Sequence, residues 1–328
     1  GLRKGLWQLV LATLVFAGVY GYGHYAQKKL TRFLANPHSL LTLQATLLQP
    51  NIDQYKKWTP EYEDEIANTL ADMGTQAATN NSYLMVWPES AVPGSLTDER
   101  YYNLFSLIGQ QSGAYQVIGS NIVAGEEEQY VGAYLLTPQG EGLSAYRKGK
   151  LVPFGEFIPF ERIVRYFVKD IEVMGELGAF LPGPHEQPLL EAGGIELGTT
   201  VCYESIFPAL WRAQTKQGAQ LFVNITNDAW FFNTAAPYQH LAVNVLRAVE
   251  NGRPVLRAAN TGFSAYIDIL GNMQVKSGLF TQEILSVRVP LSVRNSSTFY
   301  AQWGDWFAWL CAIVFFTIGI STIVFLYE

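Results

Sequence analysis

The sequence has little charge. Only 15% of its 328 residues are Asp, Glu, Lys or Arg, whereas a soluble domain usually carries about 25%. The net charge is −6, and no run of Lys or Arg appears anywhere in the chain. A protein that binds nucleic acid needs a basic surface to neutralise phosphates, so we expect no nucleic-acid partner. The hydrophobic content of 49% also excludes a largely disordered chain.

Two uncharged runs explain much of this deficit. The first covers 5–23 and the second 306–327, and each is close to the roughly 20 residues that a transmembrane helix needs. Tryptophans at the start of the second run are typical of a membrane interface. We therefore expect a transmembrane helix and linker over 1–30, a catalytic domain over 38–294 and a C-terminal transmembrane helix over 303–328.

Other interpretations of the runs are a signal peptide for the first and a buried core helix for the second. The first run is longer than a typical signal-peptide core and lacks a small-residue cleavage site. The orientation is open, because basic residues flank the first run on both sides, at 3–4 and at 28–32.

Between the runs, short β-branched and aromatic segments alternate with helical ones, which predicts an α/β domain. The expected strands cover 41–48, 83–87, 115–120, 133–137, 143–146, 195–202, 221–225, 254–259 and 265–270, and the expected helices cover 60–78, 97–112, 206–217 and 238–251. A long loop from 148 to about 188 is rich in Gly, Pro and Phe, and loops of that length in compact domains tend to be functional.

Cysteine is scarce, which makes each thiol informative. Cys311 lies in the second uncharged run and Cys202 in the domain, so we expect no disulfide between them. Cys202 stands where the strand 195–202 meets the following helix. A side chain at such a junction is exposed on a sharp turn near helix N–H groups, which suits a nucleophile. This position alone leaves core filler as an equal interpretation.

A thiol nucleophile needs a base, because only a few per cent is ionised at pH 7. The four histidines, at 24, 38, 185 and 240, stand in no recognisable motif. Glu89 in VWPES follows a strand, as Cys202 does, and such strand ends converge on one crevice. Lys148 in YRKGKLVPFGE offers a cation for an oxyanion. Taken alone, Glu89 is more often a surface residue in a turn, and Lys148 a solvated loop charge.

Taken together, VWPES, YRKGKLVPFGE, TVCYES and VNITNDAW, in this order over about 43–291, closely resemble the nitrilase superfamily. Within it, LVPFGE, CYE, TNDAWF and the flanking apolar runs are similar to the apolipoprotein N-acyltransferase family. The resemblance implies a nitrilase-like α-β-β-α sandwich flanked by two transmembrane helices. It implies Glu89 as base, Lys148 as oxyanion stabiliser and Cys202 as nucleophile, with Glu156, Tyr203 and Glu204 in support.

The resemblance also implies substrates and location. The acyl donor is a phospholipid, the acceptor is the N-terminal S-diacylglyceryl-cysteine of a lipoprotein, and no metal or cofactor takes part. The catalytic domain is expected in the periplasm, at the bacterial inner membrane. Family members carry several further N-terminal transmembrane helices, of which only the last is expected in this chain.

Four aromatic residues are predicted to meet the lipid substrate. Trp58 matches a family tryptophan near the substrate entrance, and an aromatic ring packed on a loop is an equal interpretation. Phe157, Trp230 and Phe231, with the loop 154–167, are expected to form a lipid-facing lid, unless they fill the core instead.

Two other functions fit the same residues. One is a membrane-anchored amidase that uses Glu89, Lys148 and Cys202 on a small amide, with water as the acceptor. The other is a catalytically silent anchoring module.

Overall fold

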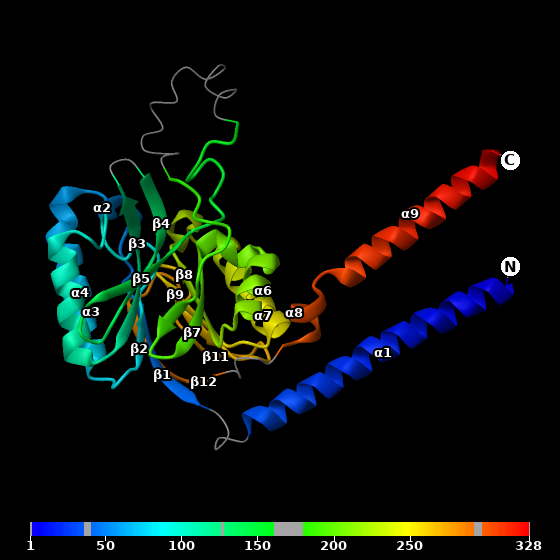
Figure 1. The fold of residues 1–328 in the computed structure, drawn as a ribbon, viewed down its shortest axis with the longest axis horizontal. Helices are drawn as coiled ribbons and strands as arrows, with labels where there is room; N and C mark the ends of the chain where they lie inside the picture. The colour runs from blue at the N-terminus through cyan, green and yellow to red at the C-terminus, as the bar shows by residue number, and fades with distance from the viewer. Residues whose placement is uncertain (1, 36–40, 126–127, 161–179, 292–296, 328) are drawn as a thin grey trace.

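The computed structural model describes residues 2–35, 41–125, 128–160, 180–291 and 297–327. The part of the expected lid beyond 160, up to 167, lies outside these described residues. Twelve strands form two six-stranded sheets among the described residues, and helices cover their outer faces (Figure 1). The domain is thus built of four layers, helix, sheet, sheet and helix, as expected.

The first sheet has the strand order β12-β1-β2-β3-β4-β5. Its strands β1, β2 and β3 run parallel to one another. β12 pairs antiparallel with β1, β4 pairs antiparallel with β3, and β5 pairs antiparallel with β4. The strands are β1 (Thr42–Gln49), β2 (Leu84–Val86), β3 (Tyr115–Ala124), β4 (Glu128–Leu136), β5 (Gly142–Arg147) and β12 (Glu283–Pro290).

The second sheet has the order β11-β10-β9-β8-β7-β6. Here β7, β8 and β9 are parallel, and the strands at both edges run antiparallel to their neighbours. The strands are β6 (Leu190–Ala192), β7 (Ile195–Val201), β8 (Leu221–Thr226), β9 (Val255–Ala259), β10 (Ala265–Ile267) and β11 (Met273–Lys276).

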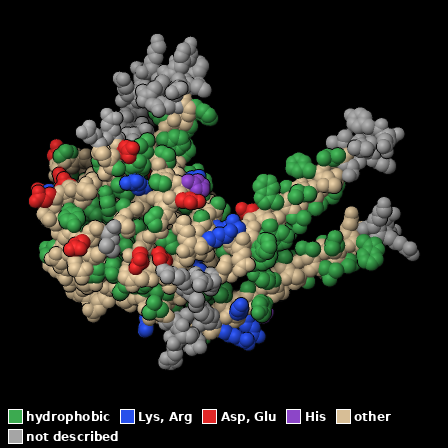
Figure 2. Space-filling model, in the orientation of Figure 1, with side chains coloured by type: hydrophobic (Ala, Val, Ile, Leu, Met, Phe, Trp, Pro, Cys, Tyr) green, Lys and Arg blue, Asp and Glu red, His purple; other side chains and the backbone are tan. Residues whose placement is uncertain are grey.

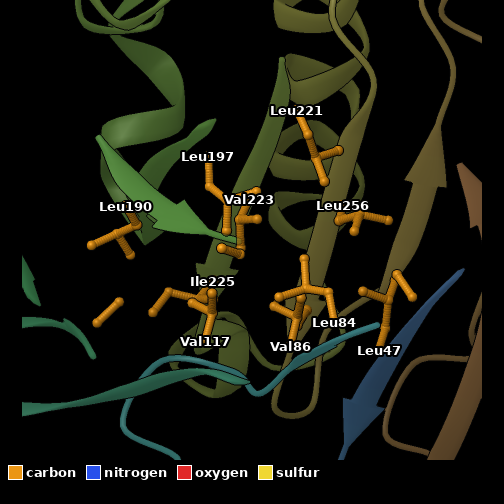
Figure 3. Packing of buried hydrophobic residues seen from close by; sticks show 14 of the residues in the cluster. Leu47, Leu84, Val86, Val117, Leu190, Leu197, Leu221, Val223, Ile225 and Leu256 are labelled. Atoms are coloured by element: carbon orange, nitrogen blue, oxygen red, sulfur yellow. The ribbon is translucent and has the colours of Figure 1, made fainter. Parts of the chain in front are cut away.

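Aliphatic side chains fill the space between the sheets. Leu47, Val86 and Val117 of the first sheet face Val223 and Leu256 of the second (Figure 3). All five are completely buried. Because these aliphatic side chains pack closely between the sheets, the ends of β2, β7 and β8 are fixed relative to one another.

The helices close the outer faces. α3 (Glu63–Ala78) and α4 (Glu99–Ser112) pack on the first sheet, and α6 (Pro208–Gln217) and α7 (Ala236–Asn251) on the second. Asp98 caps α4 by accepting a bond from Arg100 N, while Pro208 starts α6. The four expected helices are present, although 60–62, the start of the first, is a separate 3₁₀ turn.

The sequence reasoning missed three strands, and all of them lie at sheet edges. β6 and β11 are three and four residues long. β12 is longer, but six of its eight residues are partly or fully exposed, so it lacks the apolar run of a central strand. The expected strand 265–270 ends early at Ile267, because Asp268 starts a turn by accepting bonds from Leu270 N and Asn272 N.

Two apolar helices extend from the same side of the domain (Figure 1). α1 (Leu2–Leu34) contains one segment, Gly5–Arg32, that is long and apolar enough to cross a membrane. Its side chains are not covered by the rest of the chain, as the apolar surface in Figure 2 shows. α9 (Trp306–Tyr327) has 22 residues, but its segment with described side chains, Trp306–Ile318, is by itself shorter than a span.

Candidate active site

Cys202 lies on a sharp turn directly after β7. Its backbone φ is +49°, in the left-handed region that non-glycine residues rarely adopt. The residue opens the 3₁₀ turn Cys202–Ile206, and its side chain is only partly buried. Cys202 thus lies on a strained backbone where the strand ends, which is typical of a functional residue.

Glu89 approaches from the first sheet. β2 ends at Val86, and the buried ring of Trp87 packs edge-on against Phe105 at 5.0 Å between centroids. The chain then passes so close over Gly119 that a Cβ atom there would lie 2.2 Å from Pro88 O and 2.6 Å from the Glu89 Cα atom. Glycine is thus required at 119 for Glu89 to reach its place, where it is 6% exposed.

Lys148 follows β5 and is completely buried. Its Nζ atom donates to Glu156 Oε1 at 2.5 Å and to Glu89 Oε1 at 3.3 Å. The remaining carboxylate oxygens are also bound, since Val152 N donates to Glu156 Oε2 at 2.9 Å and Asn227 N donates to Glu89 Oε2 at 2.8 Å. One ammonium group thus holds two carboxylates in fixed positions.

The charges explain the protonation states. Burial alone would lower the pKa of Lys148, but the charges of Glu89, Cys202 and Glu156 outweigh it and raise this pKa, so the ammonium stays charged. Burial raises the pKa of Glu156, and Lys148 opposes that shift. Burial and the Glu89 charge raise the pKa of Cys202 to about 12, against the pull of Lys148. The resting sulfur is therefore a neutral thiol that needs a base.

Glu204 connects the turn at Cys202 to the turn at Lys148. Its Oε1 atom accepts bonds from Gly149 N at 2.7 Å and Lys150 N at 3.0 Å, and its Oε2 atom accepts one from Val201 N at 2.9 Å. The Tyr146 hydroxyl donates at 3.0 Å. Burial raises the pKa of Glu204 to about 7, although these backbone donors and Lys148 pull it down. The carboxyl thus ties together the two segments that carry the nucleophile and the cation.

The other predicted site residues are more dispersed. The ring of Tyr203 packs edge-on against Phe207 at 5.2 Å. Trp58 is 48% exposed and Trp230 65% exposed. Phe157 is half-buried, and so is Phe231, which packs against the His240 ring at 5.9 Å. Phe231 is therefore partly a packing residue, while Trp58 and Trp230 face outward.

Sequence reasoning missed a polar network behind the nucleophile. The Nε2–H of His240 donates to the Cys202 carbonyl at 3.1 Å, and Nδ1 contacts Asp228 Oδ1 at 2.8 Å. Arg257 donates to Asp228 Oδ2 at 2.8 Å. Burial would raise the pKa of Asp228, but Arg257 and His240 hold it well below its usual range. The signal lay in TNDAWF, whose Asp228 reaches this network from the end of β8.

Among the residues that the structure describes, no group of three or more His, Cys, Asp and Glu side chains is arranged to hold a metal ion. The chemistry available to the site is that of a thiol, a carboxylate that can accept its proton and a buried ammonium.

A two-sheet α/β sandwich with Cys, Glu and Lys brought together at the strand ends defines a carbon-nitrogen hydrolase fold. The sequence model of the carbon-nitrogen hydrolase family matches residues 44–297, and the chain belongs to this family. The amidase from Nesterenkonia sp. AN1 has a similar fold, with a TM-score of 0.58 over 76% of this chain and 93% of the amidase, at 23% identity. That likeness concerns the fold alone.

Closer relatives by sequence carry a more specific name. Apolipoprotein N-acyltransferase of Geobacter metallireducens is 37% identical over 308 residues, which cover 92% of this chain and 56% of the relative. The enzyme of the same name from Methylococcus capsulatus is 36% identical over 82% of this chain and 52% of the relative. The chain thus spans about half the length of the curated relatives that it matches.

Proposed function

We propose that this chain carries the catalytic part of an apolipoprotein N-acyltransferase. It transfers a fatty acyl group from a phospholipid to the α-amine of an S-diacylglyceryl-cysteine at a lipoprotein N-terminus. The proposal rests on the contact of Lys148 with both Glu89 and Glu156, together with the half-buried Cys202 on a strained turn. The names of the relatives support the choice of acyl donor and acceptor.

The first half-reaction loads the sulfur. Because the thiol is neutral at rest, Glu89 takes its proton while the sulfur attacks the ester carbonyl of the donor. Lys148 stabilises the oxyanion, to which the Tyr203 N–H is a second donor. The oxyanion collapses, the ester C–O bond breaks, and the lysophospholipid leaves with the proton held by Glu89. Cys202 is then a thioester.

The second half-reaction transfers the acyl group. The acceptor amine attacks the thioester, Glu89 takes a proton from the nitrogen, and the Cys202 sulfur leaves as a thiol once it recovers that proton. Glu156 holds Lys148 in place through both steps, because it binds the same ammonium group at shorter range than Glu89 does. No oxidant, metal or cofactor is needed for this sequence.

The proposed substrates are lipids, which links the reaction to a membrane. Exposing an acyl chain to water costs about 0.8 kcal/mol per CH₂, so the site must receive its lipid at a bilayer surface. α1 supplies one helix long enough to anchor the domain. We place α9 in the bilayer as a second span and the catalytic domain in the periplasm at the inner membrane.

Exposed aromatic side chains are suited to meet the lipid. Trp230 and Phe232 are 65% and 56% exposed, and Phe154 and Phe160 are 61% and 80% exposed. Trp58 lies beside the α2 helix (Gln54–Lys57), which contacts Asn227 next to the site. These side chains would form an apolar approach to Cys202 for an acyl chain.

The proposal is tested by intact-mass measurement of the full chain after incubation with phospholipid vesicles. A fatty-acyl adduct on the wild type that is absent from Cys202→Ala supports acyl transfer. A wild type that stays unmodified by lipid but hydrolyses small amides would instead support the amidase function.

A further inference from the structure

A second lysine is buried near the site. Lys57 is the last residue of α2 and is 1% exposed. Its Nζ atom has no hydrogen-bond partner among the residues that the structure describes. Burying an ammonium group without a partner is costly, and such groups occur almost only where they serve a purpose. The neighbouring Lys56 is different, since its side chain is 43% exposed and pairs with Glu65 at 3.2 Å.

The carboxylate whose charge acts on Lys57 is that of Glu89. Burial lowers the pKa of Lys57 to about 8, and the charge of Glu89 opposes this shift. The helix that carries Lys57 is held against the site by Gln54, whose Oε1 accepts a bond from Asn227 Nδ2 at 2.6 Å. Asn227 N in turn donates to Glu89. Lys57 and the carboxylate are therefore fixed by the same short chain of contacts.

The charges around Glu89 show why a second cation is needed there. The titratable groups that interact with Glu89 are Lys148, Glu156, Cys202 and Lys57. Without Lys57, one ammonium would serve two carboxylates, and it lies closer to Glu156, at 2.5 Å, than to Glu89, at 3.3 Å. With Lys57, two cations balance two carboxylates.

We infer that Lys57 is a positioning residue for the reaction, whose buried ammonium keeps Glu89 ionised and ready to accept the Cys202 proton. This role rests on the proposed function. It also lets Lys148, which Glu156 holds in place, donate to the oxyanion, because Lys57 continues to balance the charge of Glu89. The ammonium is too deeply buried to reach a lipid phosphate, which separates this role from headgroup binding.

Alkylation of Cys202 by acrylamide tests the inference without lipid. The full chain in detergent, with Cys311→Ser in every variant, is alkylated between pH 4 and 9 and followed by intact mass. The wild-type rate should fall on the acidic side of its pH profile, and Glu89→Gln should abolish this acidic limb. Lys57→Met should move the limb up by about one pH unit, the smallest effect typical of a nearby opposite charge, whereas Lys56→Met should leave it in place.

A limb for Lys57→Met that superimposes on the wild-type limb would overturn the inference. An unfolded fraction reacts as an ordinary exposed thiol, with a rate that rises toward the thiol pKa of about 8.5, so partial misfolding adds a separate phase that Glu89→Gln leaves unchanged and does not imitate a moved limb. Lys57→Gln is a second neutral variant with the same expected shift. If the shift is observed but phospholipid does not acylate the wild type, the proposed function is wrong and the role of Lys57 is supported. If phospholipid acylates the wild type but no shift is observed, the proposed function is supported and the role of Lys57 is wrong.

Discussion

Lys148→Met is the sharpest test of how the buried charges are arranged. The substitution keeps most of the side-chain volume but removes the ammonium that contacts Glu89 and Glu156. Two carboxylates that are 8% and 15% exposed would then lie close together without that cation. Breaking a buried ion pair by removing one partner costs about 3–5 kcal/mol, and we expect a loss of stability in this range at pH 8.

The loss should depend on pH. Without Lys148, the carboxylate pair binds a proton more tightly in the folded chain than in the unfolded one. The resulting stabilisation is present below the unfolded pKa of about 4.3 and is lost as the pH rises through the raised folded pKa. The deficit of Lys148→Met should therefore be smaller at pH 5 than at pH 8, by about 2 kcal/mol, since one pKa unit corresponds to about 1.4 kcal/mol.

Urea unfolding in detergent at both pH values measures the deficit relative to wild type. Lys150→Met removes an exposed lysine two residues away and should change stability by less than about 0.5 kcal/mol. Adding Glu156→Gln to Lys148→Met should recover part of the loss, because only one buried carboxylate then remains. A deficit that is equal at pH 5 and pH 8, or absent, would refute this account of the charges.

Three further substitutions probe the supports of the site and its approach. Gly119→Ala should displace Glu89 and lower the acylation rate of Cys202 about 100-fold, measured by intact mass, whereas normal rates would show that the close passage is not needed. His240→Ala leaves the Cys202 carbonyl without its donor and should cost about 1–3 kcal/mol on urea unfolding; an unchanged midpoint would contradict the support. Trp230→Ser should slow acylation from vesicles but not acrylamide alkylation, and Tyr102→Ser on α4 should affect neither; equal vesicle rates for both variants would argue against a lipid-facing Trp230.

Much of the fold was predictable, because central strands carry a strong signal. The strands β7, β8 and β9 are almost entirely buried and rich in aliphatic residues, a pattern that favours central strands. The edge strands β6, β11 and β12 have weaker patterns, and their place is set by pairing with a neighbour that the local sequence does not reveal.

The site was predictable in part. Glu89, Lys148 and Cys202 stand in motifs, and Glu156 lies in the same motif as Lys148. The network of Asp228, His240 and Arg257 comes from three elements, and only the packing of α7 against β8 and β9 brings it together. Lys57 illustrates the limit most clearly, since nothing in QYKKW distinguishes it from the exposed Lys56 until the helix is placed.

The most direct test of the central claim is the mass of the intact chain after exposure to phospholipid vesicles and before any acceptor is added. The wild type should carry one fatty-acyl group, released by hydroxylamine as a thioester would be, and Cys202→Ala should carry none. An acyl group that persists on Cys202→Ala, or a wild type that lipid never modifies, would contradict the claim.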